Sequence, residues 1–165
     1  MSISFLRIDD RMIHGQTVTR WSVEYPCDGL IAVNDRAANT QALKMAYKSA
    51  STKKTFVWTY DAWKKKCQKV LDSNDQYFLI TKDPIQMKKI LVDDGFVPSD
   101  VKRVIIGPCN DRPGAVKLGN NQSITQEEAE AFEAITKAGY EVEFALVKEA
   151  SIGTWDKFRG QFGFK

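Results

Sequence analysis

The chain has 165 residues and a formal net charge of +3, with 43% hydrophobic and 27% charged residues. This length suits one domain with a substantial core, and this composition excludes a disordered or membrane-spanning chain, so we expect a single domain over residues 1–165. No apolar run approaches the roughly 20 residues that span a bilayer, and the N-terminus lacks the basic and apolar regions of a secretory signal, so we expect a cytoplasmic protein.

Apolar segments and amphipathic segments alternate from the N-terminus onward. Alternating or continuous apolar patterns predict strands at residues 2–8, 30–34, 55–59 and 76–81. Between them, apolar residues recur at helical spacing and predict helices over residues 16–23, 42–50 and 63–71. Each of the first three strands is therefore followed by a helix.

The second half of the chain continues this order and marks its helix ends more clearly. Asp83 is a suitable N-cap, Pro84 fits the first helical position, and Gly95 can end the helix in a left-handed conformation. Thr125 and Glu128 form a capping-box pattern. The remaining elements are a helix over residues 126–138, strands at 103–107 and 140–147, and a short edge strand at 115–118 within the turn-rich segment 108–123.

This alternation predicts an α/β fold with a mostly parallel central sheet of about six to seven strands, covered by helices on both faces and connected by right-handed crossovers. The tail, residues 151–165, is aromatic, basic and interrupted by glycines. A loosely docked C-terminal turn is the favoured interpretation of this tail, and an interaction segment is the alternative. Its aromatic residues would also suit the interface of a homo-oligomer.

The segment RIDDRMIHGQTVTRW, residues 7–21, contains the single histidine of the chain, His14. It joins the first strand to the first helix, and ligands of open parallel sheets bind at this carboxyl edge, where helix N-termini present unpaired N–H groups. Arg11 can pair with two oxygens of a phosphate or carboxylate at once, and Gly15 allows close approach of the backbone. The loop therefore predicts an anion site beside an imidazole.

A neutral imidazole, with an ordinary pKa of about 6.5, is a nucleophile that can accept and release a phosphoryl group. Such a transfer needs mainly positioning and neutralisation of charge. Asp9 and Asp10 are both candidates to orient the imidazole or to hold Arg11, and the sequence does not choose between them. A structural role for His14 is the alternative, because a lone histidine is more often structural than catalytic.

Other classes of site find little support in the sequence. Cys27, Cys67 and Cys109 include no C-x-x-C pair, and with one histidine they cannot form the usual zinc sets, so we expect free thiols, no metal and no other cofactor. The chain has no G-x-S-x-G elbow of a hydrolase and no Walker or dinucleotide-binding loop. The small net charge does not indicate a nucleic-acid partner.

A few residues outside the histidine loop are also candidates for the site or its surroundings. Asp35 follows the second strand and either lines the site or caps the next helix, with capping favoured. Cys109 follows the fifth strand and is expected to be a structural or site-lining thiol. Arg20 and Arg112 are placed to meet an acidic partner surface, whereas lysines 64–66 are expected to form a solvated helix face.

The histidine loop closely resembles the opening motif of the IIB components of the mannose, fructose and sorbose family in the bacterial phosphoenolpyruvate-dependent sugar phosphotransferase system (PTS), R-I-D-D/E-R-L-I-H-G-Q-V. The matching residues are Arg7, Ile8, Asp9, Asp10, Arg11, Ile13, His14, Gly15 and Gln16. Met12 and Thr17 are mild departures from this motif. Weaker similarity through IAVND, GNNQSIT and EAFEAITKAGYEVE extends the resemblance over nearly the whole chain.

This resemblance implies a three-layer α/β/α sandwich and a phosphoryl relay. His14 is expected to accept a phosphoryl group on its δ nitrogen from a phosphorylated IIA component, and to pass it to a sugar that enters through the IIC and IID membrane components. Arg11 is expected to clamp the phosphate, with Gly15 and Gln16 in the same phosphate-binding loop. The protein would be a protein-phosphohistidine–sugar phosphotransferase, peripheral to the inner face of the membrane through its partners.

Alternatives to this relay also follow from the sequence. The segment around Pro108 and Cys109 departs from the more common glycine-glycine-methionine form, and IIB components of unrelated families carry the phosphoryl group on cysteine. The surrounding PCND sequence offers Cys109 little activation, so we favour His14. A non-catalytic anion- or nucleotide-binding domain, or a domain phosphorylated as a signal, is the alternative function. The identity of the sugar is not specified by the sequence.

Overall fold

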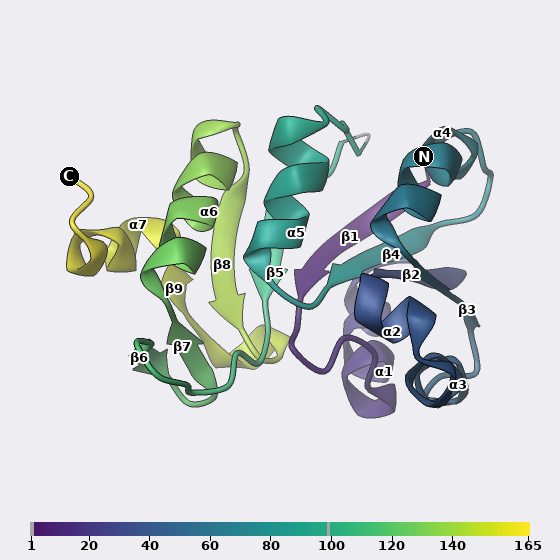
Figure 1. Cartoon of the computed structure of the whole chain (residues 1–165), viewed down its shortest axis with the longest axis horizontal. Helices are drawn as coiled ribbons and strands as arrows, with labels where there is room; N and C mark the ends of the chain where they lie inside the picture. The colour runs from purple at the N-terminus through teal and green to yellow at the C-terminus, as the bar shows by residue number, and fades with distance from the viewer. Residues whose placement is uncertain (1, 99) are drawn as a thin grey trace.

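A seven-stranded sheet forms the middle of the computed structural model, which describes residues 2–98 and 100–165, with the backbone alone at Gln16. The strand order is β3-β2-β4-β1-β5-β8-β9, and only β9 runs antiparallel to its neighbour (Figure 1). The strands are β1 Ile3–Ile8, β2 Gly29–Val33, β3 Lys54–Trp58, β4 Tyr77–Thr81, β5 Arg103–Ile106, β8 Glu141–Ala145 and β9 Ser151–Thr154. The predicted mostly parallel sheet is confirmed.

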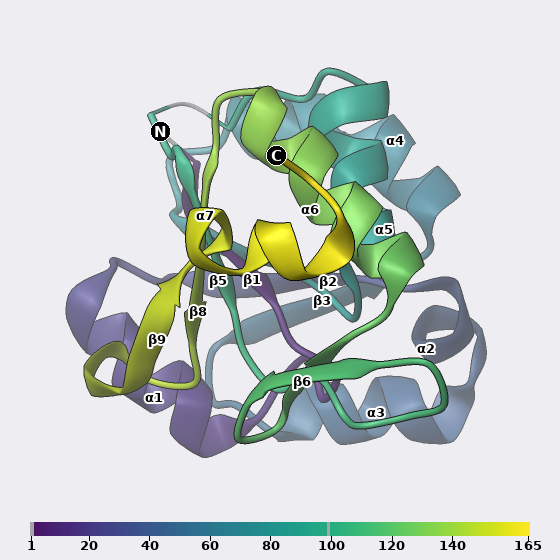
Figure 2. The ribbon, with the colours of Figure 1, turned by 90° about the vertical axis from the view of Figure 1, so that its left-hand side faces the viewer.

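Helices cover both faces of this sheet, which confirms the predicted three-layer arrangement (Figures 1 and 2). On one face lie α1 Gly15–Glu24, α2 Asp35–Asn39 and α3 Gln41–Ser49. On the other face lie α4 Tyr60–Leu71, α5 Pro84–Lys88, α6 Gln126–Lys137 and α7 Trp155–Phe158, together with a π-helical turn Lys89–Asp93 and a 3-10 turn Arg159–Phe162. A further 3-10 turn, Lys148–Ala150, follows β8.

The helix ends follow the local signals in the sequence. The Asp83 carboxylate accepts a hydrogen bond from Gln86 N at 2.9 Å, Pro84 occupies the first turn of α5, and Gly95 has a φ of +64°. Thr125 and Glu128 form the expected capping box at the start of α6. These predictions are confirmed. Capping depends on residues that are close together in the chain, so its signals can be recognised in the sequence.

The short strand predicted at 115–118 is present but lies elsewhere than expected. As β6 Val116–Gly119 it pairs antiparallel with β7 Gln122–Ile124 in a separate two-stranded hairpin, rather than at the edge of the main sheet. One parallel bridge between Cys109 and Gln122 links this hairpin to the segment that follows β5. A hairpin satisfies the backbone of both short strands without help from the main sheet.

The C-terminal tail is an integral part of the fold, so the expectation of a loosely docked turn is wrong. β9 extends the sheet, and α7 packs beside α6 through Trp155, whose ring lies 5.4 Å from that of Phe132 (Figure 2). Trp155 is only 1% exposed, and its Nε1 donates to the Glu133 carboxylate at 2.9 Å. Arg159 pairs with the same carboxylate. Aromatic burial and an ion pair to the buried Glu133 carboxylate together fix the tail.

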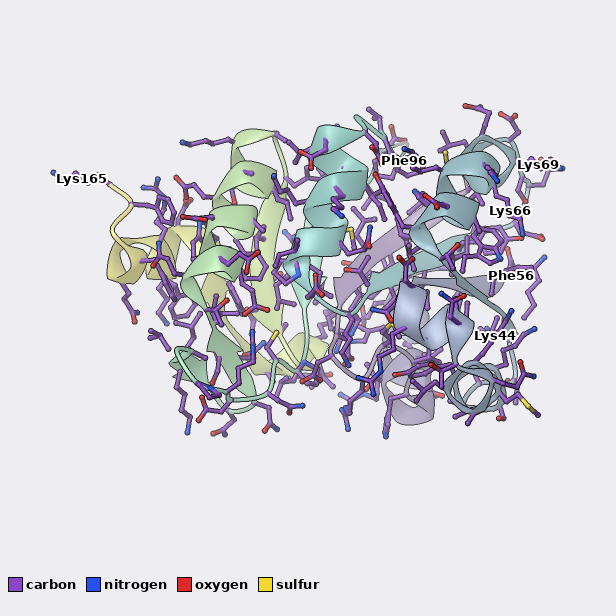
Figure 3. All side chains as sticks on the ribbon, in the orientation of Figure 1. Lys44, Phe56, Lys66, Lys69, Phe96 and Lys165 are labelled. Atoms are coloured by element: carbon purple, nitrogen blue, oxygen red, sulfur yellow. The ribbon has the colours of Figure 1, made fainter. Side chains whose placement is uncertain are left out.

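Lysines 64–66 of α4 are exposed, which confirms the expected solvated face. Lys66 Nζ lies 4.8 Å from the centre of the Trp58 ring on β3. Figure 3 shows Lys66 and Lys69 at the end of the molecule where β3 forms the edge of the sheet. Cationic side chains beside an edge strand discourage pairing with another chain.

Among the described residues, no helix combines the length and the apolar character that crossing a bilayer requires.

Replacing Trp155 with alanine is expected to lower the free energy of unfolding by about 3–5 kcal/mol, because it leaves a cavity in the core and removes a partner of Glu133. Urea unfolding followed by far-UV circular dichroism measures this loss. Asp156→Ala, at the exposed neighbouring position, serves as the control and should change stability by less than about 0.5 kcal/mol. Equal midpoints for the two variants would show that the tail does not stabilise the domain.

Candidate anion site at the carboxyl edge of the sheet

The loop of residues 9–14 leaves the central strand and is tied to both neighbouring strands. β1 lies between β4 and β5, and its last residue is followed directly by this loop. Asp9 N donates to Thr81 O at 3.0 Å on the β4 side, and Asp10 N donates to Pro108 O at 2.9 Å beyond β5. The loop therefore begins from a fixed point at the carboxyl edge, where ligands of open α/β sheets bind.

Arg7 and Asp9 form a buried ion pair beneath the loop. Arg7 is 2% exposed and Asp9 is 0% exposed, with 3.3 Å between Arg7 Nε and Asp9 Oδ2. Burial lowers the pKa of Arg7 and raises the pKa of Asp9, and the attraction between the two groups opposes both changes. Each charge is therefore stabilised by the presence of the other.

The second oxygen of Asp9 is also occupied, so this side chain serves the backbone of the loop. Asp9 Oδ1 accepts a hydrogen bond from Arg11 N at 2.8 Å, and Asp9 O accepts one from Met12 N at 2.9 Å. Met12 has a φ of +51°, a left-handed conformation that is uncommon outside glycine. The Asp9 carboxylate thus contacts Arg7 and the Arg11 backbone rather than the imidazole or the Arg11 guanidinium.

His14 occupies the N-cap position of α1 and is half-buried, with φ −133° and ψ 125°. Its imidazole makes no hydrogen bond with any group that the structure describes, and its Nδ1 atom is buried. The first hydrogen bond within the helix runs from Val18 N to His14 O at 2.9 Å. The N–H groups that precede Val18 in the helix have no partner inside it, so the positive end of α1 lies beside the ring.

Gly15 begins α1 where the helix meets the end of α3. A Cβ atom at this position would lie 2.7 Å from Ala50 O, so a larger residue would push the start of the helix away from α3. A close backbone approach at Gly15 was expected, and it is observed toward Ala50 O at the end of α3. Gln16, the other residue expected to bind phosphate, has a side chain outside the described part of the structure.

Arg11 differs from the other two arginines that were expected to meet a partner. Its side chain is exposed and forms no hydrogen bond or ion pair with any described residue. Arg20 Nη2 lies 2.6 Å from Glu149 Oε2, and Arg112 is paired with Glu128. Among these three candidates, Arg11 alone keeps its full set of side-chain donors available to an anion.

Asp10 organises the segment after β5. Its Oδ2 accepts from Asn110 N at 2.7 Å, and its carbonyl oxygen accepts from Lys82 Nζ at 3.0 Å. Asp10 and Lys82 line a pocket of about 260 Å³ together with Cys109 and Arg112. The sequence reading missed Lys82, although its position immediately after a predicted strand places it at the same edge of the sheet.

Cys109 is a free thiol in the wall of this pocket, as are Cys27 and Cys67 elsewhere in the chain. It is 4% exposed, and burial, aided by the negative charge of Asp10, raises its pKa to about 12. The thiol is therefore protonated near neutral pH, whereas nucleophilic attack requires the thiolate. This environment agrees with the expected structural or lining role.

Asp35 was expected to cap the following helix, but it instead accepts a hydrogen bond from the first N–H of α4, whose N-cap is Thr59. The distance between Asp35 Oδ1 and Tyr60 N is 2.8 Å. The cap of the following helix, α2, is instead Asn34, which accepts from Ala37 N at 2.9 Å. Asp35 forms no hydrogen bond with a described group of the histidine loop.

In the described part of the chain, no cluster of three or more His, Cys, Asp and Glu side chains is arranged to hold a metal.

Comparison with known proteins identifies similar chains. The family described as "PTS system sorbose subfamily IIB component" matches residues 3–165. The sorbose-specific EIIB component of Lacticaseibacillus casei is 25% identical over 152 residues, covering 90% of this chain and 89% of the relative. The mannose-specific EIIAB component of Escherichia coli K12 is 27% identical over 149 residues, covering 89% of this chain. The chain spans only 45% of the length of that mannose-specific relative.

The fold is likewise similar to that of a solved structure. The IIB domain of the sorbose permease from Klebsiella pneumoniae superposes with a TM-score of 0.82. The alignment covers 97% of this chain and 98% of that domain at 24% sequence identity. This likeness supports the three-layer architecture as a whole, including the C-terminal segment.

The buried position of Cys109 predicts slow alkylation. At pH 8, iodoacetamide should modify the half-exposed Cys67 at least about tenfold faster than Cys109, since a thiol whose pKa is about 12 is almost wholly protonated. Mass spectrometry of tryptic peptides after timed quenching measures both rates. Urea-unfolded protein is the control, in which the two thiols should react at similar rates. Equal rates in the folded protein would contradict the described environment.

Proposed function

The chain belongs to the sorbose subfamily of PTS IIB components, which are phosphotransferases of sugar uptake, and we propose that it carries the phosphoryl group on His14. In this proposal a phosphorylated IIA component is the donor, and a sugar entering through IIC and IID membrane components is the acceptor. The protein would act at the inner face of the membrane through these partners. The relatives named for sorbose and mannose suggest the first sugars to try.

The observation that carries this proposal is that the loop at the start of α1 holds both a half-buried imidazole and a guanidinium that has no partner among the described residues. His14 occupies the N-cap, and Arg11, three residues earlier, has no protein partner among the described residues. A phosphoryl group at the ring would meet the Arg11 fork and the free N–H groups of the helix. Both sets of donors stabilise the charge that spreads over the phosphoryl oxygens during transfer.

The transfer needs two in-line displacements at phosphorus. In the first, the lone pair of a His14 ring nitrogen forms an N–P bond while the N–P bond of the donor phosphohistidine breaks, and the donor ring keeps the released electron pair. In the second, a sugar hydroxyl oxygen attacks the same phosphorus. The His14 nitrogen leaves with its electron pair, and the hydroxyl proton passes to a base, for which the departing imidazole is suitable.

The resemblance assigns the reaction to the δ nitrogen, and the ring of His14 is free to present it. Nδ1 is buried in the observed orientation, but neither ring nitrogen is hydrogen-bonded to a described residue. A half-turn about the Cβ–Cγ bond exchanges Nδ1 with the opposite edge of the ring and breaks no hydrogen bond with a described residue. This freedom supports a ring that turns to present Nδ1 to a donor.

His14 is a better carrier than Cys109 in this chain. The Cys109 thiol is 4% exposed and has a pKa raised to about 12 by burial, so it is neither accessible to a partner nor ionised. The imidazole is half-buried at the surface end of α1 and is nucleophilic in its neutral form. These environments support histidine as the site of phosphorylation.

Incubation with the phosphorylated relay proteins tests this proposal. Wild-type protein should gain an acid-labile, base-stable label at residue 14, and His14→Ala should gain none. Arg11→Ala should be labelled about 10²-fold more slowly, because one transition-state donor is lost. Arg36→Ala, an exposed arginine on α2, is the matched control and should label at the wild-type rate.

Addition of membranes containing IIC and IID, with one sugar at a time, distinguishes the alternative functions. A carrier loses its label when the correct sugar is supplied, whereas a domain phosphorylated as a signal keeps it with every sugar. A non-catalytic anion-binding domain never gains the covalent label. Label on Cys109, or persistent label in His14→Ala, would overturn the assignment of the carrier residue.

A further inference from the structure

We propose that the buried Arg7–Asp9 pair is a positioning device for phosphoryl transfer, setting the backbone of Arg11 and the turn before His14 without touching the phosphoryl group. The inference rests on the proposed function of His14 and assigns Asp9 a different task from orienting the imidazole. The contacts of Arg7 and Asp9 support this inference, because they connect the loop to the end of β8, to α1 and to β4.

The Arg7 guanidinium donates hydrogen bonds to groups from different parts of the chain. Its Nη1 and Nη2 donate to Ala145 O at 3.4 Å and Leu146 O at 3.1 Å, at the end of β8, while Nε donates to Asp9. The guanidinium carbon also lies 5.4 Å from the centre of the Trp21 ring on α1. The planar fork of arginine, unlike a lysine ammonium, can satisfy several such partners at fixed angles.

The chain keeps space open for this guanidinium. A Cβ atom at Gly107, directly after β5, would lie 2.3 Å from Arg7 Nη2 and 2.7 Å from Arg7 Cζ. Any other residue at position 107 would therefore displace the arginine from its place between β5 and α1. This close approach indicates that the position of Arg7 is defined by the backbone around it as well as by its hydrogen bonds.

The Asp9 carboxylate connects the fixed Arg7 side chain to the backbone of the loop. With Oδ2 held by Arg7, Oδ1 lies where it accepts the Arg11 N–H at 2.8 Å. The Asp9 carbonyl oxygen accepts the next N–H, that of Met12, across the left-handed turn. Two successive backbone groups are thus held by one residue, and they determine the direction in which the exposed Arg11 side chain leaves the loop.

Other contacts between the same regions cannot replace this pair. The 3-10 turn after β8 is also linked to α1 by Lys148–Glu24 and Arg20–Glu149, but these ion pairs are exposed. Exposed pairs are screened by solvent and contribute little to geometry or stability. Of these links between the end of β8 and α1, the buried pair is therefore the one that solvent does not screen and that continues into the loop.

The experiment compares Asp9→Ala, Asp9→Asn and Glu133→Gln. Glu133 is a buried carboxylate that pairs with the half-buried Arg159 on the opposite face of the sheet, so its variant is the control for loss of a buried charge outside the loop. Each variant is measured for the KM and kcat of phosphorylation by phosphorylated IIA, for its melting temperature, and for hydrogen exchange of the Arg11 amide. The exchange measurement needs no relay protein.

Asp9→Ala should lower kcat at least about tenfold with KM changed less than about twofold, and should speed exchange of the Arg11 amide about tenfold or more. Asp9→Asn keeps an oxygen acceptor and should recover part of both. Glu133→Gln should lower the melting temperature while leaving kcat and Arg11 exchange near the wild-type values.

Wild-type kcat in Asp9→Ala, or an equal loss of kcat in Glu133→Gln, would overturn the positioning role. Failure of the wild-type protein to accept label would instead overturn the proposed function. In that case an unprotected Arg11 amide in the wild type would also refute the described hydrogen bond to Asp9, so the two failures are distinguishable.

Discussion

The central position of β1 is the constraint on which the site depends. This strand is hydrogen-bonded to β4 on one side and β5 on the other, so neither its register nor its end is free to shift without breaking two ladders. The loop after it continues both sets of contacts, through Thr81 O and Pro108 O. A mobile edge strand could not hold a nucleophile to the sub-ångström tolerance that phosphoryl transfer demands.

The arginines around the loop differ in whether a neighbouring carboxylate neutralises their charge. Arg7 is buried against Asp9, and Arg20 and Arg112 are paired with carboxylates on neighbouring elements. Arg11 has no such partner among the described residues. In the proposed transfer, an incoming dianion would meet a guanidinium that needs no prior ion pair to be broken, so their contact would carry a correspondingly larger energetic advantage.

Sequence patterns predicted those features whose causes are local. Strand and helix alternation, the Asp83 cap and the Thr125–Glu128 box depend on residues within one or two turns of each other, and all are observed. The docking of Trp155 and the hydrogen bond from Tyr60 N to Asp35 depend on residues 22 or more positions apart, which no periodicity records. The position of Arg11 in the loop after the first strand was expected, whereas its exposure and the fully occupied Asp9 carboxylate required the fold itself.

The two adjacent acids of the loop show why such roles resist assignment from sequence. Arg7 and Asp9 lie two residues apart at the end of β1 and share the α1 face, whereas Asp10 lies in the turn that follows and is directed toward the segment after β5. Asp9 fixes the start of the turn before His14, and Asp10 fixes Asn110 and the pocket beside it. Similar carboxylates at neighbouring positions thus anchor different loops, and neither of them pairs with the exposed side chain of the arginine that follows.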